Sequence, residues 1–167
     1  RYINELAAKY EAISNKIRST PMETNLKLSK MDFEDSAFPF RALLGSLLWV
    51  ARATRPDIAY SVAYLSQFAN CYGEEHYKAL LRILEYLYHT RSRELIFIKT
   101  KTPQHVVSAY SDSDWAFDIV DRKSYTGTAV FFDNAMVSWS AKKQSIVALS
   151  SCEAEYIAAA ETVKDMV

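Results

Sequence analysis

The sequence predicts an α+β protein in which a helical half precedes a half built mainly of strands. Two observations support this prediction: apolar residues recur at helical spacing between residues 40 and 90, and strand-like runs separated by turns follow from residue 105. Half of the 167 residues are hydrophobic and 13% are aromatic, which is typical of a packed chain and not of a disordered one. We expect two segments, residues 1–91 and 92–167.

Three amphipathic helices are predicted in the first segment, after a short helix at residues 2–10 and an extended connector at residues 14–38. The first follows Pro39 and presents an apolar face of Phe40, Leu43, Leu44, Leu47, Leu48 and Ala51. The second starts at Pro56, which suits a first helical position, and presents Ile58, Val62, Leu65 and Ala69. The third follows Gly73 and presents Tyr77, Leu80, Leu81, Leu84, Leu87 and Tyr88. We expect these helices to pack as an antiparallel cluster.

The second segment is predicted to form strands and then one helix. The expected strands are Glu94–Lys99, His105–Ser111, Thr126–Phe132 and Met136–Ser140, with a further short extended piece at Ile146–Leu149. Asp133 and Asn134 are expected to form a hairpin turn. The last helix is predicted to begin at Ser150, because Ser150 and Glu153 have the spacing of a capping box.

Charge, cysteines and common motifs exclude several classes of function. The 20 basic and 20 acidic side chains cancel, so a nucleic-acid role would need a local site. Cys71 and Cys152 lack metal-ligand spacing and are expected to be reduced thiols. No apolar run approaches the ~20 residues that cross a bilayer. The common phosphate-loop, zinc and serine-hydrolase motifs are missing from the sequence, so no small-molecule cofactor is expected.

Carboxylates at the ends of predicted elements are the main candidates for chemistry. Asp112 is expected to close a strand, and Glu155 lies early on the last helix with Ala158 and Ala159 three and four residues on. A Glu on a small-residue face that packs on a sheet needs a partner, and a divalent cation shared with Asp112 would supply one. The alternative is that Asp112 and Asp114 are turn residues and Glu155 is a solvated helix residue.

Ordered motifs along the whole chain indicate a family. In the second segment these are Tyr110–Ala116 (YSDSDWA), Asp121–Gly127 (DRKSYTG), Val137–Gln144 (VSWSAKKQ) and Ala148–Ala158 (ALSSCEAEYIA). Together they resemble the ribonuclease H domain of copia-type retrotransposon Pol polyproteins. Four upstream strings resemble the end of that family's reverse transcriptase and its connection: Thr20–Leu28, Phe40–Trp49, Thr54–Tyr60 and Leu80–Thr90.

The resemblance implies a helical connection followed by a partial ribonuclease H-like fold, with an antiparallel three-strand start of the sheet and its first helix. It also implies cleavage of the RNA strand of an RNA–DNA hybrid by two Mg²⁺ ions, with Mn²⁺ as a substitute, held by four acidic residues. Asp112 and Glu155 match two of these residues. The other two are expected beyond Val167, and the polymerase aspartates before Arg1, so both ends are expected to be internal to a longer chain. The isolated chain is therefore expected to be a weak enzyme or an inactive one.

Several other residues are candidates for contacts with the hybrid. Arg122, Lys123, Lys142 and Lys143 are expected to meet substrate phosphates or to be ordinary solvated charges. Ser113 is expected to approach the nucleic-acid backbone or to be a small turn residue. Trp115 and Trp139 are expected to pack in the core, with a groove-lining role as the alternative.

The expected partners are an RNA–DNA hybrid and the rest of the Pol polyprotein, with no membrane. The resemblance implies a cytoplasmic virus-like particle, with later nuclear entry as an alternative. A different class of function stays open, namely a decayed or host-retained remnant without catalysis that binds nucleic acid or protein.

Overall fold

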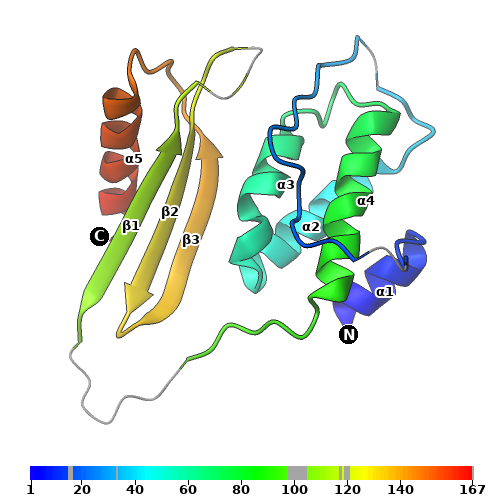
Figure 1. The fold of residues 1–167 in the computed structure, drawn as a ribbon, viewed down its shortest axis with the longest axis horizontal. Helices are drawn as coiled ribbons and strands as arrows, with labels where there is room; N and C mark the ends of the chain where they lie inside the picture. Colours follow the sequence, from blue (N-terminus) through cyan, green and yellow to red (C-terminus); the bar gives the residue numbers. More distant parts are fainter. Residues whose placement is uncertain (15–16, 33, 98–104, 117, 119–120, 167) are drawn as a thin grey trace. The chain divides into compact units, whose positions relative to one another are not determined.

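The computed structural model describes residues 1–14, 17–32, 34–97, 105–116, 118 and 121–166. The chain forms two compact units, Arg1–Glu94 and Leu95–Val167, so the division falls close to the predicted one at residue 91. The first unit is helical and the second contains a sheet and a helix (Figure 1). The predicted α+β class is confirmed. In the described ranges, no helix combines the length and the apolar character needed to cross a membrane.

The first unit contains all the helices predicted for it. They are α1 (Tyr2–Lys9), α2 (Phe40–Ala53), the short 3₁₀ turn η1 (Pro56–Ile58), α3 (Ala59–Ser66) and α4 (Glu74–His89). Helix α2 packs against α3 and α4, and α1 packs against α4. The fully buried side chains at the centre are large and apolar, among them Phe40, Leu43, Leu47, Ile58, Leu65, Phe68, Leu80, Ile83, Leu84 and Leu87.

Details of the predicted faces differ from the structure. On α2, Val50 is buried while Leu48 is only half-buried. Helix α3 ends at Ser66, so the chain no longer follows helical spacing and Phe68, not Ala69, enters the core. On α4, the ring of His76 is buried, and its Nδ1 accepts a hydrogen bond of 3.2 Å from the backbone N–H of Gly73.

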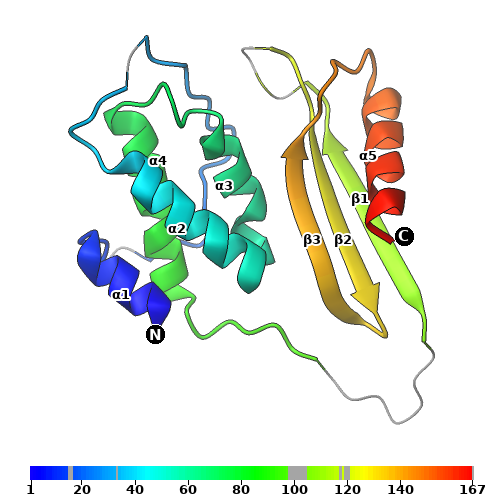
Figure 2. The same cartoon turned by 180° about the vertical axis from the view of Figure 1, so that it is seen from behind.

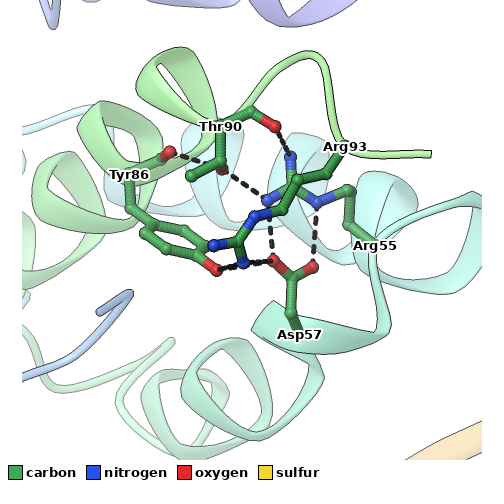
Figure 3. A network of polar contacts seen from close by, with 5 residues as sticks. All are labelled: Arg55, Asp57, Tyr86, Thr90 and Arg93. Atoms are coloured by element: carbon green, nitrogen blue, oxygen red, sulfur yellow. Dashed lines mark hydrogen bonds and ion pairs between the residues drawn. The ribbon is translucent and has the colours of Figure 1, made fainter. Parts of the chain in front are cut away.

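A buried polar network joins the start of η1 to the end of α4 (Figure 3). The guanidinium of Arg55, whose side chain is 4% exposed, donates to both carboxylate oxygens of Asp57 at 2.8 and 2.7 Å and to the Thr90 hydroxyl at 2.6 Å. Tyr86 donates its hydroxyl proton to Asp57 at 2.7 Å, and Arg93 donates to the Tyr86 oxygen at 2.7 Å. Burial alone would raise the pKa of Asp57, but the hydrogen bonds from Arg55 and Tyr86 outweigh it and lower that pKa.

The second unit has a three-stranded antiparallel sheet and one helix. The strands are β1 (Val107–Asp114), β2 (Tyr125–Phe132) and β3 (Ala135–Lys143), in the order β1-β2-β3, and the helix is α5 (Ser151–Met166). Asp133 and Asn134 join β2 to β3 with positive φ values of 45° and 68°, which suits the tight turn of a hairpin. The register shifts at Val130/Phe131, where an irregularity interrupts the β2–β3 pairing.

Helix α5 packs on β1 and β2 and runs beside β1 in both views (Figures 1 and 2). Its buried residues Ala154, Ala158 and Thr162 are small, and they meet a sheet face that carries the buried Thr126 and Thr128. The predicted cap is confirmed in part. Ser150 Oγ accepts from the Glu153 N–H at 3.1 Å, but the Glu153 carboxylate accepts from the N–H of Leu149, not of Ser150.

Two predicted strands are not formed in the described part of the chain. Residues 94–97 of the predicted strand Glu94–Lys99 are irregular, and residues 98 and 99 lie outside the described residues. Ile146–Leu149 forms bends and irregular backbone. The remaining strands are longer than predicted, since β1 extends to Asp114 and β3 to Lys143.

Candidate functional site

Asp112 lies within strand β1, two residues before its end, and not at the predicted end. Its cross-strand partner on β2 is Gly127, which presents no side chain. Because side chains alternate along a strand, Asp112 lies on the face opposite to Ser113 and to its partner Thr126. The residue is exposed, and its carboxylate has no hydrogen-bond or ion-pair partner within the described ranges.

Glu155 lies in the second turn of α5, and its side chain is exposed. The prediction that it shares a buried face with Ala158 is wrong, because the helix turns about 100° per residue and its buried face follows Ala154, Ala158 and Thr162. Ile157 and Glu161 line a cavity toward β2 and β3. Glu155 lies on the other flank of the helix, toward β1, and makes no hydrogen bond or ion pair to any residue that the structure describes.

Asp112 and Glu155 stand on two packed elements, β1 and α5, but α5 covers the sheet face of Thr126 and Thr128, and Asp112 lies on the opposite face. Strand β1 pairs with β2 alone among the described strands, so its other edge is open. No group of three or more His, Cys, Asp or Glu side chains that could hold a metal occurs within the residues described. Asp114 also lies on β1, on the same face as Asp112, and its Oδ1 accepts from the Tyr125 N–H. Carboxylate oxygens are the ligands that Mg²⁺ takes.

Lys143 has a structural position that the sequence analysis missed. Its ammonium lies 2.8 Å from Asp118 and 2.9 Å from Asp121, and the Asp118 side chain is 2% exposed. Burial alone would lower the pKa of Lys143, but the hydrogen bonds to both carboxylates outweigh it and raise that pKa. The phosphate contact predicted for Lys143 stays a prediction, and in this structure the ammonium is paired with two carboxylates.

The other predicted contact residues fall into two groups. Arg122 and Lys142 are exposed and Lys123 is half-buried, and no ion pair of these side chains is found in the described part. Ser113 lies within β1 and is half-buried, with its hydroxyl oxygen shielded from solvent, so it is not a turn residue; its contact with the nucleic-acid backbone stays a prediction. Trp115 is 52% exposed and donates to the Ala148 carbonyl at 3.1 Å, so the prediction that it packs in the core is wrong.

One functional candidate, Gln144, carried no signal in the sequence beyond its place in a motif. It follows β3 directly and is 6% exposed. Nearby, a cavity of about 150 Å³ lies between α5 and strands β2 and β3, lined by Thr128, Ser140, Gln144, Glu161 and Asp165 among others. Nothing in local spacing showed that Gln144 would reach a helix ten residues further along the chain.

Sequence comparison with curated proteins identifies the family. The chain is 38% identical over 175 residues, all of its length, to the retrovirus-related Pol polyprotein from transposon TNT 1-94 of Nicotiana tabacum. It is 42% identical over 168 residues, 99% of its length, to the retrovirus-related Pol polyprotein from transposon RE1 of Arabidopsis thaliana. The chain belongs to the copia-type retrotransposon Pol family. It spans 13% and 11% of these two polyproteins.

This retrotransposon Pol segment is also similar to a short protein. It is 40% identical over 129 residues to a protein of Plasmopara viticola named secreted RxLR effector protein 161, covering 77% of the chain and 89% of that protein. No family model matches the chain. No solved structure matches it.

Proposed function

We propose that this Pol segment joins the end of a reverse transcriptase, residues 1–91, to the beginning of a ribonuclease H domain, residues 92–167. In this proposal the second unit contributes two carboxylates to a site that cleaves the RNA strand of RNA–DNA hybrids. The observation that carries it is the placement of Asp112 and Glu155. Both are exposed and without a partner in the described part, Asp112 on β1 and Glu155 on α5, which packs on β1.

Asp112 offers an exposed carboxylate that suits a divalent cation. Gly127 opposite Asp112 leaves the adjoining surface free of a side chain, and a Cβ added there would come no closer than 3.9 Å to the Asp112 carbonyl. Two Mg²⁺ ions, when bound, would supply charge stabilisation at the scissile phosphate and a water of lowered pKa. Asp112 and Glu155 would hold them through oxygen atoms, which Mg²⁺ prefers.

The phosphates of the hybrid would be met by cations beside the sheet. The candidates are Arg122, Lys123, Lys142 and Lys143, and Lys143 would have to leave Asp118 and Asp121 to bind a phosphate. Such contacts weaken with salt, since each neutralised phosphate releases counterions.

The chain supplies two of the four carboxylates that a complete two-metal site would use. Two carboxylates carry half the charge of two Mg²⁺ ions and offer too few ligands for octahedral coordination. We expect weak Mg²⁺ binding and slow or undetectable cleavage by these 167 residues alone, and metal-dependent cleavage when the segment is part of a longer Pol protein.

The test compares hybrid cleavage in Mg²⁺ and in Mn²⁺ by the chain and by a longer Pol protein that contains it. Asp112→Asn and Glu155→Gln should abolish cleavage by the longer protein. Glu161→Gln should retain it, because Glu161 lies on the cavity side of α5 and pairs with Lys164 at the surface. Full activity of Asp112→Asn in the longer protein would refute the proposed site.

A second candidate function is a remnant without catalysis that binds nucleic acid or protein. Two observations favour it: no cluster of three metal-binding side chains occurs within the described ranges, and a similar stretch makes up most of a much shorter protein. Hybrid binding by the 167-residue chain that is unaffected by Asp112→Asn and by removal of Mg²⁺ would support this candidate against the first.

A further inference from the structure

One side chain of β3 holds two residues of the segment that joins β1 to β2. Lys143, the last residue of β3, places its ammonium 2.8 Å from the Asp118 carboxylate and 2.9 Å from that of Asp121. The Asp118 side chain is only 2% exposed, so removing its partner would leave a buried charge uncompensated. The ion pairs therefore fix two points of the segment to the end of β3.

The same two aspartates organise the backbone on either side of Arg122. The Asp118 carboxylate accepts from the Asp121 N–H at 3.4 Å, and the Asp118 carbonyl accepts from the Arg122 N–H at 2.9 Å. The Asp121 carboxylate accepts from the Lys123 N–H at 3.1 Å. Each backbone N–H from residue 121 to residue 123 is thus bonded to one of the two residues that Lys143 pairs with. The position of Arg122 and Lys123 follows from those pairs.

Arg122 has a backbone conformation that residues with a side chain rarely adopt. Its φ is 57°, in the left-handed region, where a glycine would fit without steric cost. Its side chain is exposed, and no hydrogen bond or ion pair of the guanidinium is found within the described ranges. An arginine at this position is therefore not explained by stability, whereas a strained and exposed cation is suited to contact a ligand.

The segment is held on the same face of the sheet as Asp112. Lys143 is the cross-strand partner of Tyr125, which in turn pairs with Asp114, and the Lys143 ammonium lies 6.0 Å from the centroid of the Tyr125 ring. Asp112 precedes Asp114 by two residues, so it lies on this face about 7 Å further along β1. Helix α5 covers the opposite face. A nucleic acid on the uncovered face would meet Asp112 and the cations of the segment together.

We propose that Asp118 and Lys143 are positioning residues that hold Arg122 and Lys123 where these two cations bind phosphates of the hybrid. This inference rests on the proposed function, because Arg122 and Lys123 are among its candidate phosphate contacts. It gives Lys143 an indirect role, in which the ammonium stays on the two carboxylates while the hybrid is bound. A direct contact requires the reverse, since the ammonium must then leave Asp118 and Asp121.

The test is binding of an RNA–DNA hybrid to the full chain, measured by fluorescence anisotropy at several salt concentrations without divalent cations. Asp118→Asn removes a negative charge and should nevertheless weaken binding to the polyanion. The Asn oxygen can keep the bond to the Asp121 N–H, but its NH₂ group then faces the ammonium and cannot hold it. If Lys143 bound a phosphate itself, Asp118→Asn would free the ammonium and tighten binding.

The salt dependence of binding counts the phosphate contacts that are lost. Lys143→Met should lower the slope of log affinity against log salt by about 2, as for two lost contacts, because Arg122 and Lys123 are both released. A direct contact of Lys143 alone would lower it by about 1. Lys143→Arg, which keeps a cation for both carboxylates, should restore binding. In a chain that already carries Arg122→Gln and Lys123→Gln, Lys143→Met should change the slope no further.

Glu161→Gln and Lys164→Met are the matched controls. They break an exposed ion pair of 2.6 Å on α5, and both should leave the slope unchanged. If Asp118→Asn does not fold, Asp121→Asn makes the same distinction at a carboxylate that is 39% exposed.

Tighter binding by the Asn variant, or a slope that falls by only about 1 in Lys143→Met, would overturn the positioning role and leave the proposed function intact. Failure of the unsubstituted chain to bind the hybrid at low salt would overturn the phosphate contacts themselves, and the inference with them.

Discussion

His76 shows how one buried side chain can replace the usual cap of a helix. Helix α4 begins after Gly73, which has no side chain to accept from the first N–H groups, and the His76 ring reaches back to accept from the Gly73 N–H. A ring that accepts at Nδ1 is neutral and carries its proton on Nε2. Burial lowers the pKa of His76 from its usual 6.5, and the ring packs 4.5 Å from Phe68 between centroids.

The first prediction concerns the pH dependence of this residue. Since the pKa of His76 is lower in the folded than in the unfolded chain, the unfolded chain binds the proton more readily. The stability that the neutral ring provides is complete above pH 6.5 and declines as the pH falls below it. Denaturant unfolding of the first unit at pH 8 and at pH 5.5 should therefore show lower stability at the acidic pH.

His76→Gln should reduce that pH difference, because an amide does not titrate in this range. His105→Gln, which changes an exposed residue of the second unit, should leave it unchanged. An undiminished pH difference in His76→Gln would assign the effect to other groups.

Residue spacing in the sequence could not predict which side chains pair when the two residues lie on different elements. The role expected of Asp112 and Glu155 came from their motifs and stays a prediction, and both residues are exposed. The pairing of Lys143 with Asp118 spans 25 residues, and the hydrogen bond from Gln144 to Ala154 joins the residue after β3 to helix α5. Such pairs depend on how elements pack, and no local periodicity encodes that packing.

Helix α5 approaches the sheet closely because its buried face is made of small residues. Ala154 and Ala158 are fully buried, and Thr162 donates its hydroxyl proton to the Ala158 carbonyl inside the helix. The opposing sheet positions are Thr126 and Thr128, which are also small. The contact therefore leaves little room for a larger side chain at Ala154 or Ala158, which lie outside the cavity.

The second prediction follows from this close approach. Ala158→Leu should destabilise the second unit by about 2 kcal/mol, because the added atoms must push α5 away from the sheet. Ala159→Leu should change stability by less than about 0.5 kcal/mol, because Ala159 is exposed. Thermal unfolding of both variants measures the difference, and equal melting temperatures would show that the interface tolerates the larger residue.

Helices and strands were predicted correctly where a periodic pattern of apolar residues was delimited by proline, glycine or turn residues. Helices α2 and α4 begin directly after Pro39 and Gly73, and the β2–β3 hairpin turns at Asp133 and Asn134 as expected. The predicted strand at residues 94–97 failed, because a strand is formed by pairing and these residues have no paired neighbour among the described strands. An alternating pattern shows that a segment suits a sheet, but the segment forms a strand only when a neighbouring strand pairs with it.

At the scale of the molecule, each unit has its own core. The first is built from helices whose largest buried residues are Phe, Leu and Ile, and the second from a sheet covered by α5 on one face. The polar network around Arg55 belongs to the first unit alone. A change within it should therefore act on that unit and leave the stability of the other core unaltered.

The third prediction uses this separation. Asp57→Ala should destabilise the first unit by about 3 kcal/mol, because it leaves the buried Arg55 guanidinium without its carboxylate. Hydrogen exchange measured by peptide should rise in α2 and α4 and stay unchanged in β2 and α5. Asp32→Ala, at an exposed position, should change neither unit. Faster exchange in both units after Asp57→Ala would show that they unfold as one.

The turn at Asp133 and Asn134 has a consequence for the order in which the second unit folds. A hairpin closed by two residues needs only short-range encounters and forms in microseconds. Strand β1 must instead bridge the segment between Asp114 and Tyr125 before it can pair. During synthesis, β2 and β3 can therefore pair before α5 has emerged. Helix α5 then packs against the face of the hairpin that carries Thr126 and Thr128.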